Sequence, residues 1–120
     1  EHKHLMISAD FLRDVFIPSW YETWMSDLIE DLNMTALVEP KAVRDVTIDN
    51  EGITAFSIIT TSHIVLHTWE TTTPYKLQLD VYSCKGFNVD TVIYRLKDFD
   101  ILNVKYKFLD RENGFVNIDE

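Results

Sequence analysis

The residues best suited to chemistry lie in two stretches, residues 60–70 and a later segment that ends at Cys84. The first stretch contains a hydroxyl nucleophile, two imidazoles and a carboxylate: Ser62, His63, His67 and Glu70. Cys84 is the only thiol of the chain. A serine beside a histidine suggests nucleophilic chemistry, and the thiol is a further reactive group.

These residues taken alone leave several interpretations open. A serine hydrolase is disfavoured because no Gly-x-Ser-x-Gly elbow surrounds Ser62. His63 and His67 would share one face of a strand, but two imidazoles without a third ligand are a weak metal signal, and we expect no metal. A lone cysteine such as Cys84 is more often a small buried hydrophobe than a catalyst, and the Thr and Ser residues can simply be strand formers.

The composition is that of one globular domain spanning residues 1–120, with 46% apolar and 26% charged residues. The chain has 20 acidic and 11 basic residues, a net charge of -9. This surface repels phosphate backbones and anionic lipid, so we expect neither nucleic acid nor membrane as a partner. The lone cysteine excludes an internal disulfide framework and suits a reducing cytoplasm, the predicted location.

Two segments have the apolar spacing of amphipathic helices. The first follows Pro18, a residue favoured at the first helical position. Its apolar stripe consists of Tyr21, Met25, Leu28, Ile29 and Leu32. The second helix begins after Asn88, a good N-cap. Its stripe consists of Val89, Val92, Ile93, Leu96 and Phe99. Both helices need a sheet to cover.

The remaining segments predict strands, rich in β-branched residues and bounded by turn signals. The expected strands are residues 4–11, 42–48, 53–61, 64–69, 76–84 and 101–109. Alternation in the fifth places Leu77, Leu79 and Val81 under the helices and Cys84 on the second face. The order of elements predicts an α+β fold, a two-layer sandwich with a mainly antiparallel β-sheet and two helices on one face. The second face would then be free for a partner, so a dimer is plausible.

Residues 61–69, Thr-Ser-His-Ile-Val-Leu-His-Thr-Trp, and residues 80–84, Asp-Val-Tyr-Ser-Cys, resemble a known processing and active-site block. The block is that of the small prokaryotic type of S-adenosylmethionine decarboxylase. Its pattern is a Ser-His pair, an apolar triplet, His-Thr-Trp, and a cysteine that ends a later strand. The chain length, the Lys3-His4-Leu5 opening and the Gly52-Ile53-Thr54 segment agree with this family as well.

The resemblance implies that the chain makes its own cofactor. In the family, the serine that matches Ser62 attacks the preceding carbonyl, here that of Thr61, and the backbone breaks between the two residues. A pyruvoyl group remains at the new N-terminus. Its ketone forms a Schiff base with S-adenosylmethionine and accepts electrons as carbon dioxide leaves, the role that pyridoxal phosphate has in other enzymes. The product serves spermidine synthesis.

The resemblance also implies roles for four other residues. His67 matches the histidine that assists proton removal during self-cleavage, and Thr54 stands where the family has a serine whose hydroxyl helps the same step. Cys84 matches the residue that returns a proton to the decarboxylated carbon. Glu70 is the candidate for holding the ribose hydroxyls of the substrate. Family members of this size generally work as homodimers.

These groups are not brought together by regular strands. Ser62 and His67 are five positions apart, so one regular strand sends them to opposite faces. Thr54 lies eight positions before Ser62, about 26 Å along a straight strand. We therefore expect a turn or bulge within residues 60–63 that gathers them into one site.

Two alternative functions stay open. An uncleaved, non-enzymatic homologue that binds a ligand or a partner is motivated by Thr61, where the family has glutamate, and by the missing proline after Trp69. A pyruvoyl-dependent decarboxylase of another amino acid is motivated by residues 39–51 and 70–75, which depart from the family pattern.

Overall fold

The computed structural model describes residues 2–118, which form one seven-stranded sheet and two α-helices. The elements follow in the order β1 (Lys3–Phe11), α1 (Pro18–Asp31), β2 (Ala36–Asp45), β3 (Gly52–Ile59), β4 (Ser62–Trp69), β5 (Tyr75–Ser83), α2 (Val89–Leu96), β6 (Ile101–Asp110) and β7 (Val116–Asn117). A short 3-10 turn, Lys97–Phe99, extends α2. The strand order is β2-β3-β4-β5-β1-β6-β7, and each described pair is antiparallel.

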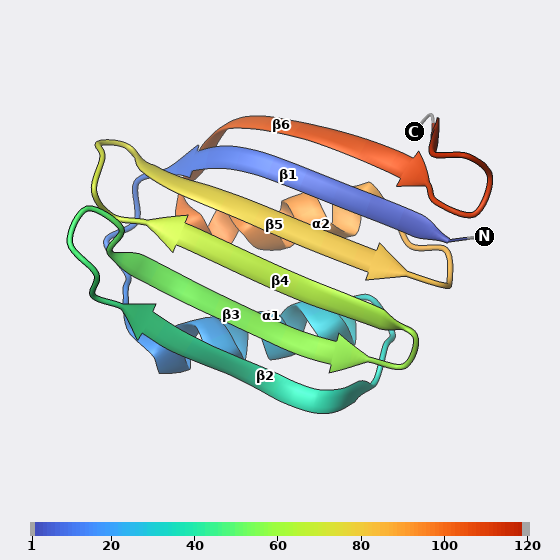
Figure 1. The fold of residues 1–120 in the computed structure, drawn as a ribbon, viewed down its shortest axis with the longest axis horizontal. Coiled ribbons are helices and arrows are strands. Elements are labelled where there is room, and N and C mark those ends of the chain that lie inside the picture. Colours follow the sequence, from blue (N-terminus) through green and yellow to red (C-terminus); the bar gives the residue numbers. More distant parts are fainter. Residues whose placement is uncertain (1, 119–120) are drawn as a thin grey trace.

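Both helices lie on the same side of the sheet (Figure 1). The helix-facing side chains of the central strands alternate with half-buried ones, as in Leu77, Leu79 and Val81 of β5, which are at most 2% exposed. The apolar stripe of α1 packs on them through Tyr21, Trp24, Met25, Leu28 and Ile29, and that of α2 through Val89, Val92 and Leu96. The predicted fold class is therefore confirmed.

Local signals set the helix ends. Pro18 is the first residue of α1, and Asn33 ends it in a left-handed conformation, with φ of 56°. The Asn33 amide donates to the Glu30 carbonyl and the Met34 amide to that of Ile29, which is the Schellman pattern. At α2, the Asn88 side chain accepts a hydrogen bond from the Asp90 amide at 2.8 Å. The predicted N-cap is thus confirmed.

Most strand boundaries differ by one or two residues from the sequence predictions, and two of the differences affect the account below. The strand expected at residues 42–48 is β2, Ala36–Asp45, an edge strand with two register shifts, and residues 46–48 lie beyond it. The strand expected to reach residue 84 stops at Ser83. Cys84 therefore begins the next loop, and its predicted place on the second face of the strand is wrong. No helix among residues 2–118 has both the length and the apolar content to cross a membrane.

Candidate active site

The β3–β4 hairpin places the predicted cleavage site at its turn. Ile59 pairs with Ser62, so Thr60 and Thr61 are the only residues between the two strands. Thr61 has φ of 51°, in the left-handed region that β-branched residues rarely adopt. Such a conformation costs roughly 1–3 kcal/mol. The peptide bond after Thr61 thus follows a strained residue.

Ser62, Thr61 and Cys84 meet at this edge of the sheet. Ser62 is buried at 8% exposure, and its Oγ accepts a hydrogen bond from the Cys84 amide at 3.3 Å. The Cys84 Sγ lies 2.6 Å from Thr61 Oγ1. The thiol borders a small hollow of about 260 Å³, which the loop after α1 closes on the other side through Asn33 and Met34.

The surroundings of Cys84 favour its thiolate. The Thr61 hydroxyl has the largest effect and lowers the pKa of the thiol. Burial has the second-largest effect and raises this pKa, and the Ser62 hydroxyl and the cation of Lys85 lower it further. Hydroxyl donors stabilise the anion more than the neutral thiol, which is the physical reason for this direction. A thiol with a lowered pKa is a suitable proton carrier near neutral pH.

Thr54 and His67 form a second group. They face each other across β3 and β4, and Thr54 Oγ1 lies 2.9 Å from His67 Nδ1. The contact orients the imidazole, because the hydroxyl can donate to or accept from the ring nitrogen according to its tautomer. The hydroxyl and imidazole that the sequence paired are therefore in contact.

The two groups lie far apart within one chain. The β3–β4 register runs without a shift from Thr54 opposite His67 to Ile59 opposite Ser62. His67 is then about 17 Å from Ser62 along β4, on the opposite face of the sheet. The expectation that a turn or bulge in residues 60–63 gathers all these residues in one copy is wrong. A turn does form there, but it joins Ser62 to Cys84 instead.

Glu70 lies at the same end of the sheet as His67, directly after β4. Its carboxylate forms an ion pair with the guanidinium of Arg44, and its amide donates to the Glu51 carbonyl at 2.9 Å. Its side chain is 16% exposed and borders a hollow of about 470 Å³ together with Asp14 and Tyr75. Glu70, the residue predicted to bind the ribose hydroxyls, thus already forms an ion pair with Arg44 of β2.

A third polar group was missed by sequence reasoning. On the uncovered face, Asp80 of β5 contacts two imidazoles: His4 Nε2 at 2.6 Å and His63 Nε2 at 3.1 Å. The alternation of β5 already indicated that Asp80 faces away from the helices. Its partners were unpredictable, because they come from strands whose neighbours the sequence does not reveal. No cluster of metal-ligating side chains is found among residues 2–118.

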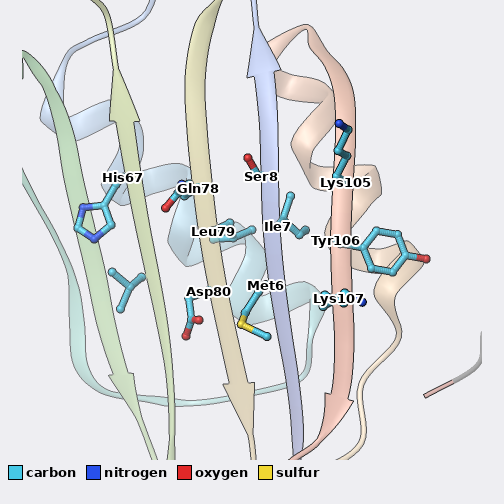
Figure 2. Close-up of a pocket in the computed structure, with 11 residues that line it drawn as sticks. Met6, Ile7, Ser8, His67, Gln78, Leu79, Asp80, Lys105, Tyr106 and Lys107 are labelled. Atoms are coloured by element: carbon cyan, nitrogen blue, oxygen red, sulfur yellow. The ribbon is translucent and has the colours of Figure 1, made fainter. Parts of the chain in front are cut away.

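The same face carries a shallow hollow of about 700 Å³ that spans β4, β5, β1 and β6. Figure 2 shows His67 of β4 at one side of it, Lys105 of β6 at the other, and Gln78, Asp80 and Met6 on the strands between them. The hollow is open because no described element covers this face between residues 2 and 118. It connects the surroundings of His67 with the cluster around Asp80.

The protein is an α+β sandwich that carries a serine at a strained hairpin turn and a cysteine beside this serine. The family model of S-adenosylmethionine decarboxylase matches residues 7–112, and the chain belongs to this family.

One solved structure, described as the adenosylmethionine decarboxylase from Aquifex aeolicus VF5, has the same fold. It matches with a TM-score of 0.74 at 15% sequence identity, over 99% of this chain and 95% of that chain. A comparison with curated protein sequences finds no match.

Proposed function

We propose that this chain is a self-cleaving proenzyme that decarboxylates S-adenosylmethionine with a pyruvoyl group made from Ser62, for spermidine synthesis. The observation that carries the proposal is the arrangement at the β3–β4 turn. A strained Thr61, a buried Ser62 hydroxyl and the Cys84 thiol all adjoin one peptide bond. We place the enzyme in the cytoplasm, where a lone thiol stays reduced.

Self-cleavage needs only groups adjoining this bond and a proton carrier. The Ser62 Oγ attacks the Thr61 carbonyl carbon, a C–O bond forms, the C–N bond breaks, and the proton passes from Oγ to the released nitrogen. Loss of the Ser62 Cα proton then expels residues 1–61 as a carboxylate, and water converts the remaining group to a ketone with release of ammonia. Departure of Thr61 from its left-handed conformation contributes a driving force of order 1–3 kcal/mol.

The residues around Ser62 fit a pyruvoyl group. Ser62 is buried, which limits the access of water, and the Cys84 amide donates to Ser62 Oγ, the oxygen that leaves with residues 1–61 when the group forms. The group supplies a ketone that accepts electrons while carbon dioxide leaves the substrate. Cys84 is the proton donor to the decarboxylated carbon, because it lies beside Ser62, the residue from which the group is made.

We further propose that the active enzyme is a homodimer whose site is shared. His67 and Thr54 of one copy are too far from Ser62 of the same copy to act on it, so a second copy must supply them. The uncovered sheet face supports a dimer, because it bears half-buried apolar side chains such as Phe56 and Val65 that a second copy would cover. Burial of these side chains would stabilise the dimer.

A second candidate function is pyruvoyl-dependent decarboxylation of another amino acid. The ion pair between Glu70 and Arg44 favours it, because a carboxylate already held by a guanidinium is less available to ribose hydroxyls. In this case the self-cleavage chemistry is unchanged and only the substrate differs.

Release of labelled carbon dioxide tests these proposals. The purified protein is incubated with S-adenosylmethionine labelled at the carboxyl carbon, and in parallel with labelled arginine, ornithine and lysine. We expect release from S-adenosylmethionine alone and none with Ser62→Ala. Release from a basic amino acid instead would support the second candidate. No release from any of them, with the backbone intact, would leave the uncleaved binding homologue.

A further inference from the structure

We propose that Thr61 is a positioning residue for Cys84: its hydroxyl holds the thiol against the Thr61–Ser62 bond in the uncut chain, and cleavage of that bond releases the thiol. The inference rests on the proposed self-cleavage for its second half only. Its first half concerns the uncut chain, where the contact between Thr61 Oγ1 and Cys84 Sγ at 2.6 Å is present.

The contact joins two segments that are otherwise separate. Thr61 belongs to the β3–β4 turn, and Cys84 follows β5, 23 positions later in the chain. The Cys84 amide also donates to Ser62 Oγ at 3.3 Å. The main chain of residue 84 is thereby tied to Ser62 and its side chain to Thr61, so the thiol is held beside the bond that breaks.

The Thr61 hydroxyl can serve both protonation states of the thiol. Its Oγ1 also lies 2.8 Å from the Thr60 carbonyl oxygen, to which it can donate. When Cys84 is a neutral thiol, the hydroxyl proton points to Thr60 and the S–H donates to Oγ1. When Cys84 is a thiolate, the hydroxyl rotates and donates to sulfur, because a hydroxyl has one proton and two lone pairs.

Because its hydroxyl can rotate in this way, Thr61 allows Cys84 to lose and regain its proton. It stabilises the anion without blocking its return to the neutral state. The charged environment is simple: Lys85 is the one charged side chain among the described residues that line the hollow. The contact with the Thr61 hydroxyl therefore has the largest effect on the protonation of this thiol that a substitution can remove. Thr61→Val removes the hydroxyl at nearly constant side-chain volume.

Cleavage changes the position of Thr61. In the uncut chain, the β3–β4 turn forces φ of 51° on this residue and thereby aims its hydroxyl at sulfur. After cleavage Thr61 is a chain end with a new carboxylate and is no longer forced into the turn. The thiol then loses its hydroxyl partner, and it is free of this contact when a substrate carbon later requires its proton.

The pH dependence of Cys84 alkylation tests the first half in an uncut background. Ser62→Ala prevents cleavage, and iodoacetamide labelling is followed by mass spectrometry as a function of pH. We expect the Ser62→Ala/Thr61→Val variant to have its labelling midpoint at higher pH, with labelling at pH 7 slower by about threefold. The Ser62→Ala/Thr61→Ser variant, which keeps the hydroxyl, should retain the midpoint of Ser62→Ala. Thermal melting by circular dichroism establishes that all three are folded.

Equal midpoints for the valine and serine variants would overturn the role of Thr61, whether or not the wild-type chain cleaves itself. The second half is tested by comparing Ser62→Ala with cleaved wild-type protein. We expect the cleaved protein to have the higher labelling midpoint. An unchanged midpoint in fully cleaved protein would overturn the release, whereas a wild-type chain that stays whole would refute the proposed function and leave the Thr61 comparison standing.

Discussion

Replacement of His67 by alanine removes an imidazole that lies about 17 Å from Ser62 of its own chain, on the other face of the sheet. If His67 acts in self-cleavage, it acts on the Ser62 of a second copy. A mixed dimer of a His67→Ala chain and a Ser62→Ala chain then contains one complete site, built from Ser62 of the first and His67 of the second. The other site of the same dimer lacks both groups.

The size of the effect follows from the geometry and from the chemistry of proton transfer. Loss of a positioned acid or base slows a step by roughly 10²–10⁴-fold, so His67→Ala alone should remain uncut over hours. In an equal mixture, random pairing of symmetric dimers places about half of the His67→Ala chains with a Ser62→Ala partner. We expect about that fraction to be cleaved.

The assay is co-expression of the two chains with different tags, followed by gel electrophoresis and intact-mass measurement of each tagged species. The matched control is a helper chain that carries both Ser62→Ala and His67→Ala, which should give no cleavage of its partner. Fast cleavage of His67→Ala alone would refute a role for this histidine. Slow cleavage that the Ser62→Ala helper fails to accelerate would refute a site shared between copies.

Two further predictions concern the scaffold. A Cβ at Gly52 would lie 1.8 Å from the Thr68 carbonyl oxygen, so Gly52→Ala should destabilise the fold by about 3 kcal/mol in urea unfolding. Gly114→Ala, which meets no atom but keeps a strained φ of 75°, should cost only about 1 kcal/mol, and equal losses would contradict the clash. Burial raises the pKa of Tyr21. Above pH 10 this tyrosine therefore ionises in the unfolded chain but not in the folded one, and the free energy of unfolding should fall as pH rises. Tyr21→Phe should show a shallower fall than wild type or Tyr94→Phe; parallel curves would contradict this assignment.

The fold class could be predicted from the sequence because the spacing of apolar residues identifies the buried face of each helix and strand. The apolar positions of the two helices and the alternation of Leu77, Leu79 and Val81 specify one covered sheet face, and those residues are buried there. Pro18 and Asn88 marked helix starts through their restricted backbone and side-chain acceptor. The edge strand β2 was misplaced because its register shifts interrupt the alternation on which the prediction depended.

The residues of the candidate site came from the family resemblance, and their arrangement was only partly predictable. Family resemblance named Ser62, Cys84, Thr54 and His67, and the structure brings them together as two pairs. Alternation gives the face of a side chain but not its neighbour on another strand, so the separation of the pairs and the contacts of Asp80 with His4 and His63 required the three-dimensional pairing.

The most direct test of self-cleavage at Ser62 is the intact mass of purified protein after incubation, measured before and after treatment with a carbonyl-reactive reagent. We expect two polypeptides, residues 1–61 and residues 62–120, of which only the second reacts through a ketone at its first position. A single species with the mass of the whole chain, inert to the reagent, would contradict it.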